Sequence, residues 1–164
     1  MLITFKRLIL ELTRQCNMRC AHCMRGEPED KTIGTGILER LFREVRHIEH
    51  LGLTGGEPAL VPEQIEWIVH LAKRWGCTIG HFFCATNGKA YSPAFTEALE
   101  KLYRYCIQKD QCTLSISFDQ FHEPADPKAV EQYSRLPFYK PVNERRTLAP
   151  NEILSEGRAK ENGL

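Results

Sequence analysis

The 164-residue sequence lacks an excess of charge of either sign, since 22 basic side chains stand against 21 acidic ones for a net charge of +1. Such a balance gives no electrostatic reason to expect a nucleic-acid or membrane partner. Long hydrophobic runs are also missing, and Lys6, Arg7 and Glu11 interrupt the apolar N-terminus too early for a signal peptide or a spanning helix. We therefore expect a cytoplasmic protein with no membrane partner.

Internal repeats and low-complexity tracts are absent as well. The composition is ordinary for a globular protein, with 42% hydrophobic and 26% charged residues. A chain of 164 residues is close to the usual size of one domain. We therefore expect residues 1–164 to form a single domain.

Cysteine, in contrast, is plentiful, with seven residues in the chain. Three of them, Cys16, Cys20 and Cys23, fall within the eight residues CNMRCAHC, which suits metal chemistry in a reducing compartment better than a disulfide framework. The scattered four are expected as buried small hydrophobic side chains rather than as a second metal site, although one near a strand end could instead approach a substrate. These four are Cys77, Cys106, Cys112 and, at that strand end, Cys84.

Strand-like and helix-like segments alternate along the chain. Strands are expected at 7–13, 50–54, 77–85 and 113–119, and helices at 35–48, 62–75, 92–106 and from 126 onward. This alternation predicts parallel βαβ units with right-handed crossovers. From residue 137 to 164 the pattern is irregular, with a doubtful fifth strand at 152–154. The expected fold class is α/β, a partial (β/α) TIM-like barrel of four or five parallel strands.

Two of these segments carry predictions about their faces. The first helix should bury Ile37, Leu41, Val45 and Ile48 along one side. In the fourth strand, apolar residues alternate with Ser115, Ser117 and Asp119. If the apolar side meets the helices, these polar side chains point into a barrel lumen; the alternative is an edge strand that faces water.

The chemistry of three clustered thiolates leaves two interpretations open. A structural zinc site needs four ligands, commonly from two paired halves, and only one half is present, so His22, His47 or His50 would have to complete it. An iron-sulfur cube takes one cysteine per iron, so three cysteines leave one iron open to a small molecule.

At this point the sequence resembles a known family. CNMRCAHC is similar to the CxxxCxxC motif of the radical S-adenosylmethionine superfamily, and LTGGEP at 53–58 is similar to its GGEP motif. Each follows directly on a predicted strand, as in the family. ATNG at 85–88 and SISFD at 115–119 resemble the ends of the family's third and fourth strands. The resemblance covers about residues 7–123.

The resemblance implies a specific set of ligands. Cys16, Cys20 and Cys23 would hold a 4Fe-4S cluster, and Gly55, Gly56 and Glu57 would receive the ammonium group of S-adenosylmethionine, with Glu57 as the acceptor. The remaining implied cofactor contacts are Thr86, Asn87, Ser115, Ser117 and Asp119. The implied reaction is reductive cleavage of S-adenosylmethionine to a 5'-deoxyadenosyl radical that abstracts hydrogen from a substrate.

The resemblance also implies partners. The substrate would be a peptide or a small molecule, and a flavodoxin or ferredoxin would supply one electron. Because the family's usual core has six strands, a partner could close the open side of this shorter barrel. Two alternative functions stay open: an activase that makes a radical on a partner protein, and a non-catalytic zinc-binding interaction module.

Two further segments have competing interpretations. His122 and Glu123, after the fourth strand, are expected either to contact substrate or cofactor or to lie in a solvated loop. Residues 156–160, EGRAK, resemble a segment that follows the fifth strand in some peptide-modifying members of the family. Such a short charged stretch is more commonly a solvent-facing surface.

Overall fold

A four-stranded parallel sheet forms the centre of the molecule, in a computed structural model that describes residues 3–89, 91–141 and 145–164. The strand order is β1-β2-β3-β4. The strands are β1 (Ile3–Glu11), β2 (Val45–Thr54), β3 (Thr78–Thr86) and β4 (Thr113–Ile116). All three strand pairs are parallel, so the predicted α/β class and the parallel βα order are confirmed.

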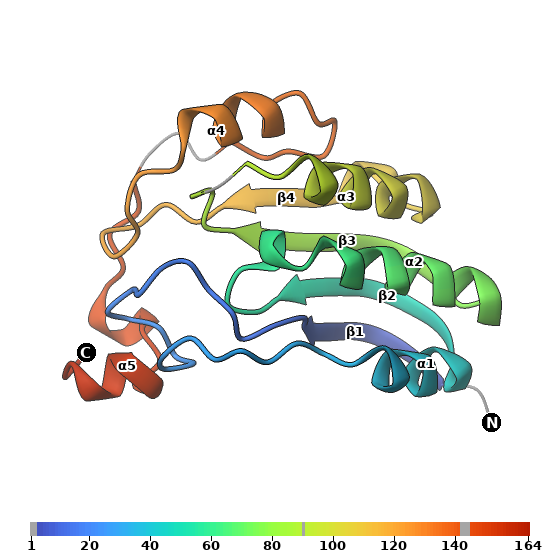
Figure 1. The fold of residues 1–164 in the computed structure, drawn as a ribbon, viewed down its shortest axis with the longest axis horizontal. Coiled ribbons are helices and arrows are strands. Elements are labelled where there is room, and N and C mark those ends of the chain that lie inside the picture. Colours follow the sequence, from blue (N-terminus) through green and yellow to red (C-terminus); the bar gives the residue numbers. More distant parts are fainter. Residues whose placement is uncertain (1–2, 90, 142–144) are drawn as a thin grey trace.

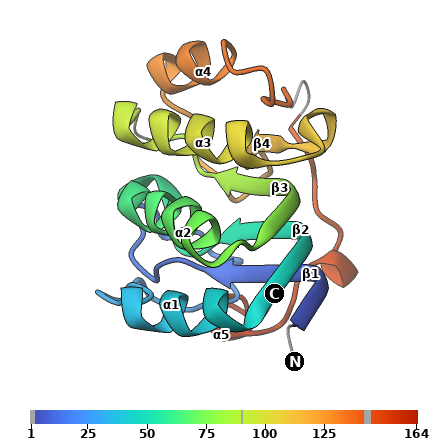
Figure 2. The ribbon, with the colours of Figure 1, turned by 90° about the vertical axis from the view of Figure 1, so that its right-hand side faces the viewer.

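Helices connect the strands and cover one face of the sheet. The α-helices are α1 (Thr35–Glu44), α2 (Pro62–Trp75), α3 (Pro93–Tyr105), α4 (Pro127–Tyr133) and α5 (Gly157–Glu161). Short 3-10 turns are η1 (Pro58–Leu60), η2 (Lys109–Gln111) and η3 (Pro150–Glu152). Helices α1 to α3 lie side by side on the same face (Figures 1 and 2). The strands therefore form an open sheet and not a closed barrel, as the expectation of a partial barrel requires.

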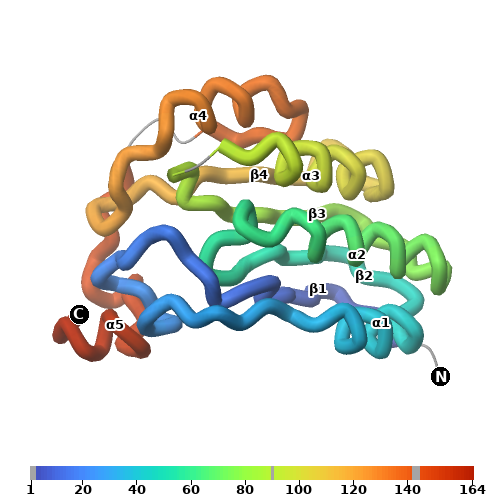
Figure 3. The backbone as a smooth tube through the Cα atoms, viewed as in Figure 1, coloured from blue at the N-terminus to red at the C-terminus, as the bar shows by residue number. Residues whose placement is uncertain are grey.

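The strands all run toward one end of the molecule. There the segment between β1 and α1, residues 12–34, forms a long irregular loop that we call the cysteine loop, and α5 lies against it (Figure 3). The carboxyl ends of parallel strands are where α/β proteins usually bind ligands. The cysteines are therefore at the end of the sheet suited to a site.

Local sequence explains several helix boundaries. Helix α2 begins with Pro62 at its first turn and ends at Gly76, whose left-handed φ of 66° only glycine adopts freely. The Ser92 hydroxyl accepts a hydrogen bond of 3.3 Å from the Phe95 amide at the start of α3. These starts and the stop after Trp75 agree with the predicted helices.

The predicted first helix was too long. Helix α1 ends at Glu44, and Val45 and Ile48 belong to β2, which pairs with β1 from its first residue. The buried residues of α1 are Leu38 and Phe42, whereas Ile37 is 52% exposed. Val45 and Ile48 continue the apolar period of the helix, so the sequence predicts them as part of it. Their pairing with β1 decides their conformation instead.

The prediction of a fifth strand at 152–154 was wrong. Glu152 closes the 3-10 turn η3, and the place beside β4 is taken by residues from earlier in the chain. Tyr139 and Arg146 form isolated parallel bridges with Leu114 and Asp119. Pro137 and Pro141, on either side of Tyr139, have no amide proton to donate, which limits the pairing of this residue to a single bridge.

The strand ends differ from prediction by a few residues. Strand β1 begins at Ile3 rather than residue 7, and β4 ends at Ile116 rather than 119, although the Ser117 amide still donates to Thr86 O at 2.8 Å. In β4, Leu114 and Ile116 are buried while Ser115 is partly exposed, so the apolar side does face the helices.

The core lies between the sheet and helices α1 to α3. The four scattered cysteines are at most 2% exposed, as predicted for small hydrophobic side chains: Cys77, Cys84, Cys106 and Cys112. Within the described ranges, no helix has the length and hydropathy needed to span a membrane.

A cysteine-lined cavity at the carboxyl end of the sheet

A cavity of about 320 Å³ opens at the carboxyl ends of the strands. Its walls come from the cysteine loop, the ends of β2 and β3, and the segment 152–158. Nine of the eleven predicted site residues line it: Cys16, Cys20, Cys23, Gly55, Gly56, Glu57, Thr86, Asn87 and Ser117. Ser115 and Asp119 are not in its lining. Residues from four separate segments of the sequence therefore meet around one space.

The two glycines of the GGEP motif let the cysteine loop approach β2 closely. A Cβ atom on Gly56 would lie 2.1 Å from the carbonyl oxygen of Gln15, and one on Gly55 would lie 2.5 Å from that of Thr13. The Gly56 amide donates to Thr13 O at 2.7 Å and the Glu57 amide to Gln15 O at 2.8 Å. The glycines are thus required by the backbone that carries Cys16, before any ligand is considered.

Glu57 is the buried anionic group of the cavity, with 2% of its surface exposed. Its carboxylate accepts hydrogen bonds from the Ala59 amide at 3.0 Å, the Thr86 hydroxyl at 2.7 Å and the Asn87 amide at 2.7 Å. Burial raises the pKa of Glu57 against the opposing effect of these donors. A cation placed beside this carboxylate would relieve the cost of burying its charge.

Asn87 connects Glu57 to the first cysteine. Its side-chain amide donates to Asn17 Oδ1 at 2.7 Å and lies 3.8 Å from Cys16 Sγ as a hydrogen-bond donor. Thr86 and Asn87, predicted as cofactor contacts, therefore hold the carboxylate and the first cysteine in fixed positions.

The three clustered thiols influence one another electrostatically. Burial, and after it the charges of Cys16 and Cys23, raise the pKa of Cys20 to about 11. Burial also raises the pKa of Cys16, with Glu57 and Cys23 adding to the effect. Thiolates at these positions are costly without a cation, so a metal centre that binds them replaces their protons.

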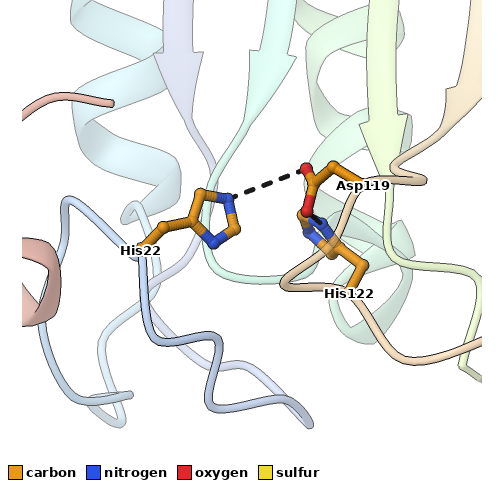
Figure 4. A group of neighbouring side chains, drawn as sticks. All are labelled: His22, Asp119 and His122. Carbon is orange, nitrogen blue, oxygen red and sulfur yellow. Dashed lines mark ion pairs between the residues drawn. The ribbon is translucent and has the colours of Figure 1, made fainter. Parts of the chain in front are cut away.

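The arrangement of the thiols differs from that of a site for one ion. Among the described residues, one group of histidine and acidic side chains has ligand atoms that all lie within 4.8 Å of one another. The three cysteines do not belong to this group. His47 and His50 do not line the cavity, and His22 points toward Asp119 (Figure 4). Thiolates that bind separate irons of a cube need not converge on one point.

Helix α5 holds the cysteine loop from outside. The Arg158 amide donates to Cys23 O at 2.9 Å, its guanidinium to Arg19 O at 2.6 Å, and the Asn162 side chain to Ala21 O at 3.0 Å. A Cβ atom on Gly157 would lie 2.4 Å from the Gly26 nitrogen. The Arg158 side chain is 15% exposed and lines the cavity, so the solvent-facing interpretation of 156–160 was wrong for this residue.

The cavity is also lined by residues outside the predicted site, only some of which the sequence analysis had named as candidates. His122 lines the cavity, which favours the first of its two expected roles, whereas Glu123 is 68% exposed in its side chain and pairs with Lys89. Met18, Ile153 and Leu154 also line the cavity and were missed, because isolated apolar residues in irregular segments carry no pattern that marks them.

The fold and the site together define a partial parallel βα barrel with a cysteine triplet and a glycine-glycine-glutamate strand end around one cavity. A profile described as the Radical SAM superfamily matches residues 10–150, and the chain belongs to this superfamily. Members of the family use a 4Fe-4S cluster and S-adenosylmethionine.

Curated relatives match over part of the chain. Molybdenum cofactor biosynthesis protein 1 of Homo sapiens is 36% identical over 90 residues, which are 49% of this chain and 14% of that protein. GTP 3',8-cyclase of Geobacter sulfurreducens is 34% identical over 88 residues, which are 49% of this chain and 26% of that enzyme. The chain therefore spans about a quarter or less of the length of these relatives.

A solved structure shares the fold. Native anSMEcpe with bound AdoMet and Cp18Cys peptide superimposes with a TM-score of 0.50 at 19% identity, over 71% of this chain and 33% of that one. This likeness supports the partial-barrel architecture.

Proposed function

We propose that this chain binds a 4Fe-4S cluster through Cys16, Cys20 and Cys23, and S-adenosylmethionine beside Glu57, and that it cleaves the latter reductively. The observation that carries the proposal is the shared cavity, in which the three thiols and the GGEP motif form neighbouring walls. The cofactors would supply a 5'-deoxyadenosyl radical that abstracts hydrogen from a substrate.

The thiols fit such a cluster by their chemistry. The raised pKa values of Cys16 and Cys20 reflect burial and repulsion between the charged forms of neighbouring thiols, both of which a cluster of positively charged irons would remove. Asn87 stands next to Cys16 Sγ as a hydrogen-bond donor, a kind of contact that tunes the reduction potential of iron-sulfur clusters.

Glu57 fits the ammonium end of S-adenosylmethionine. A carboxylate has about four lone-pair sites, and three donors already occupy some of them. The three donors fix the carboxylate at the cavity wall, and a cationic amine would complete its shell. Ser117 lines the same cavity, and we propose Ser115 as a further contact near the end of β4, whereas Asp119 lies outside the cavity lining and pairs with His122.

The substrate class is proposed in two forms. A small molecule is supported by the relative named GTP 3',8-cyclase, and a peptide by the likeness to the peptide-bound anSMEcpe structure. In either case a flavodoxin or ferredoxin is the proposed one-electron donor, and the surrounding residues would hold the substrate against the reactive carbon and exclude water.

A second candidate function, an activase that acts on a partner protein, is favoured by the face of the sheet opposite α1 to α3. Ile9 and Phe83 are 60% and 41% exposed there, on either side of Gly52 in the strand register. Exposed apolar side chains in a row are typical of a surface that another segment or chain covers. A partner that closes this open side is part of the proposal.

The test is cleavage of S-adenosylmethionine by the full chain after anaerobic reconstitution with iron and sulfide. With dithionite as reductant, we expect 5'-deoxyadenosine to form without any added substrate. The Cys20→Ser variant should lose this activity, whereas Cys112→Ala, a change at the opposite end of the sheet, should keep it.

Metal analysis of the same samples separates the remaining alternative. About four irons and four sulfides per chain support the cluster. Stoichiometric zinc with no iron, together with no 5'-deoxyadenosine, would establish the non-catalytic zinc-binding module instead.

A further inference from the structure

A second set of metal-ligating side chains lies beside the cysteines. His22 comes from the cysteine loop, and Asp119 and His122 follow β4. One ligand atom from each lies within 4.8 Å of the other two, and the side chains are 19%, 12% and 13% exposed (Figure 4). We call these three residues the His-Asp-His cluster.

The distances in the His-Asp-His cluster suit ligands of one ion. When two metal-ligand bonds of about 2.1 Å meet at a tetrahedral angle, the ligand atoms are about 3.4 Å apart. Asp119 Oδ1 lies 2.8 Å from His122 Nδ1, and Asp119 Oδ2 lies 3.9 Å from His22 Nε2. These two separations, one to each oxygen of the carboxylate, lie on either side of that value.

The surroundings of His122 Nδ1 also suit a metal ligand. Although its Nδ1 atom is 2.8 Å from Asp119 Oδ1, it is buried and has no hydrogen-bond partner of acceptable geometry among the described residues. A ring nitrogen without a well-aligned hydrogen bond can give its lone pair to a metal ion, and the neighbouring carboxylate oxygen can do the same.

Neighbouring contacts hold the ligands in place. The Phe121 ring stacks on His22 with centroids 4.6 Å apart, and the Phe121 amide donates to Asp119 Oδ1 at 2.9 Å. One residue therefore fixes both the imidazole from the cysteine loop and the carboxylate after β4, so little ordering is left for an ion to impose.

We propose that the His-Asp-His cluster binds one divalent transition-metal ion, distinct from the centre held by the cysteines. Two imidazoles and one carboxylate are a donor set suited to Zn²⁺ or Fe²⁺. Three protein ligands leave at least one coordination position open, and His22 and His122 both line the cavity. The open position faces this cavity and takes an anionic oxygen group, such as a carboxylate.

The test uses the full chain with Cys16→Ser, Cys20→Ser and Cys23→Ser, which removes the thiolates as competing ligands. Co²⁺ is the probe, followed by calorimetry and visible absorption. We expect one ion per chain. In this background, His122→Ala and the shape-conserving Asp119→Asn should each weaken binding by more than about 100-fold, since even changes to residues behind the ligands cost 10- to 100-fold.

His70→Ala is the matched control, because His70 is an exposed histidine on α2, and it should leave the affinity unchanged. Circular dichroism of each variant confirms that it is folded. Absence of stoichiometric Co²⁺ binding, or binding that survives both His122→Ala and Asp119→Asn, overturns the proposal. Since this variant cannot assemble the cysteine-bound cluster, the outcome is independent of the proposed function.

Discussion

Glu57 is the residue whose surroundings are most specific to the site. It is buried, and its three hydrogen-bond donors come from η1 and the end of β3. By accepting the hydrogen bond from the Asn87 amide, Glu57 also holds the Asn87 side chain beside Cys16. The carboxylate thus has a structural role that exists before any ligand binds.

Replacing Glu57 with alanine should therefore destabilise the fold. Glu57→Ala leaves three donors without an acceptor, and we expect the free energy of unfolding to fall by about 2 kcal/mol, since the cost of burying the carboxylate is removed at the same time. Urea denaturation measures this change. Glu97→Ala, at an exposed position of α3, should shift it by less than about 0.5 kcal/mol; equal effects of the two variants would contradict the structural role.

Gly56 offers a test of the close approach between the cysteine loop and β2. Gly56→Ala places a methyl group 2.1 Å from Gln15 O, so the loop must move away from the strand end. We expect iron incorporation after reconstitution to fall several-fold, measured as iron per chain. Gly36→Ala is the control, because nothing lies within 4 Å of its added Cβ, and it should incorporate iron like the unmodified chain.

Asp119 should make stability depend on pH. Burial alone would raise its pKa, but the His122 imidazole, the Phe121 amide and the nearby His22 together lower it. A carboxyl group whose pKa is lowered by folding contributes stability above its unfolded pKa of about 3.9, and this contribution is lost as the pH falls through the folded value.

Asp119→Asn should accordingly be less stable than the unmodified chain at pH 7, and the difference should shrink as the pH falls below about 4. Urea midpoints measured at pH 7 and pH 3 provide the comparison. A difference of the same size at both pH values would show that the charge of Asp119 contributes nothing to stability.

At the scale of whole elements, the cysteine loop depends on α5 for its position. Three hydrogen bonds from Arg158 and Asn162 reach backbone oxygens of the loop, and Gly157 sits against Gly26. This short C-terminal helix belongs to the site even though it lies outside the matched residues 10–150.

Loosening this contact should expose the loop. Gly157→Ala, with a φ of 52° and a Cβ 2.4 Å from the Gly26 nitrogen, should speed amide hydrogen exchange in residues 16–28 by about tenfold or more, because it forces the helix away. Lys160→Ala, an exposed change in the same helix, is the control. Unchanged exchange in the Gly157 variant would mean that the loop keeps its fold without α5.

Much of the element order was predictable from the sequence, and the failures have physical causes. Pro62, Ser92 and Gly76 mark helix ends through local backbone chemistry, so α2 and α3 were predicted within one or two residues. Val45 and Ile48 were assigned to a helix because they continue its apolar period, but pairing with β1 decides their conformation. Tyr139 and Arg146 lie beside β4 through single tertiary bridges, which leave no periodic pattern in the sequence.

The convergence of candidate site residues on one cavity was predictable where a motif carried it. The cysteine triplet, Gly55 to Glu57 and the Thr86-Asn87 pair all line one cavity as expected. The role of Arg158 was not predictable from its short charged segment. Its contact with Cys23 joins residues far apart in the chain, which sequence patterns do not indicate. The convergence of His22 with Asp119 and His122 is likewise a tertiary event that sequence spacing does not indicate.

At the scale of the whole molecule, the open sheet is the feature that the proposed chemistry has to accommodate. Helices α1 to α3 cover one face (Figure 2). Ile9 and Phe83 are exposed on the other. A radical reaction needs water excluded from the reacting atoms. We therefore expect substrate-coupled turnover to require a second component that covers this face, whereas cleavage of S-adenosylmethionine alone does not.

The central claim is an iron-sulfur cluster held by three cysteines with one iron available to an exogenous ligand. Mössbauer spectroscopy of the chain reconstituted with ⁵⁷Fe, before and after addition of S-adenosylmethionine, tests it most directly. We predict that one of about four irons changes its spectrum and the others do not. A cluster whose irons are all unaffected by S-adenosylmethionine, or a chain that assembles no cluster, would contradict the account.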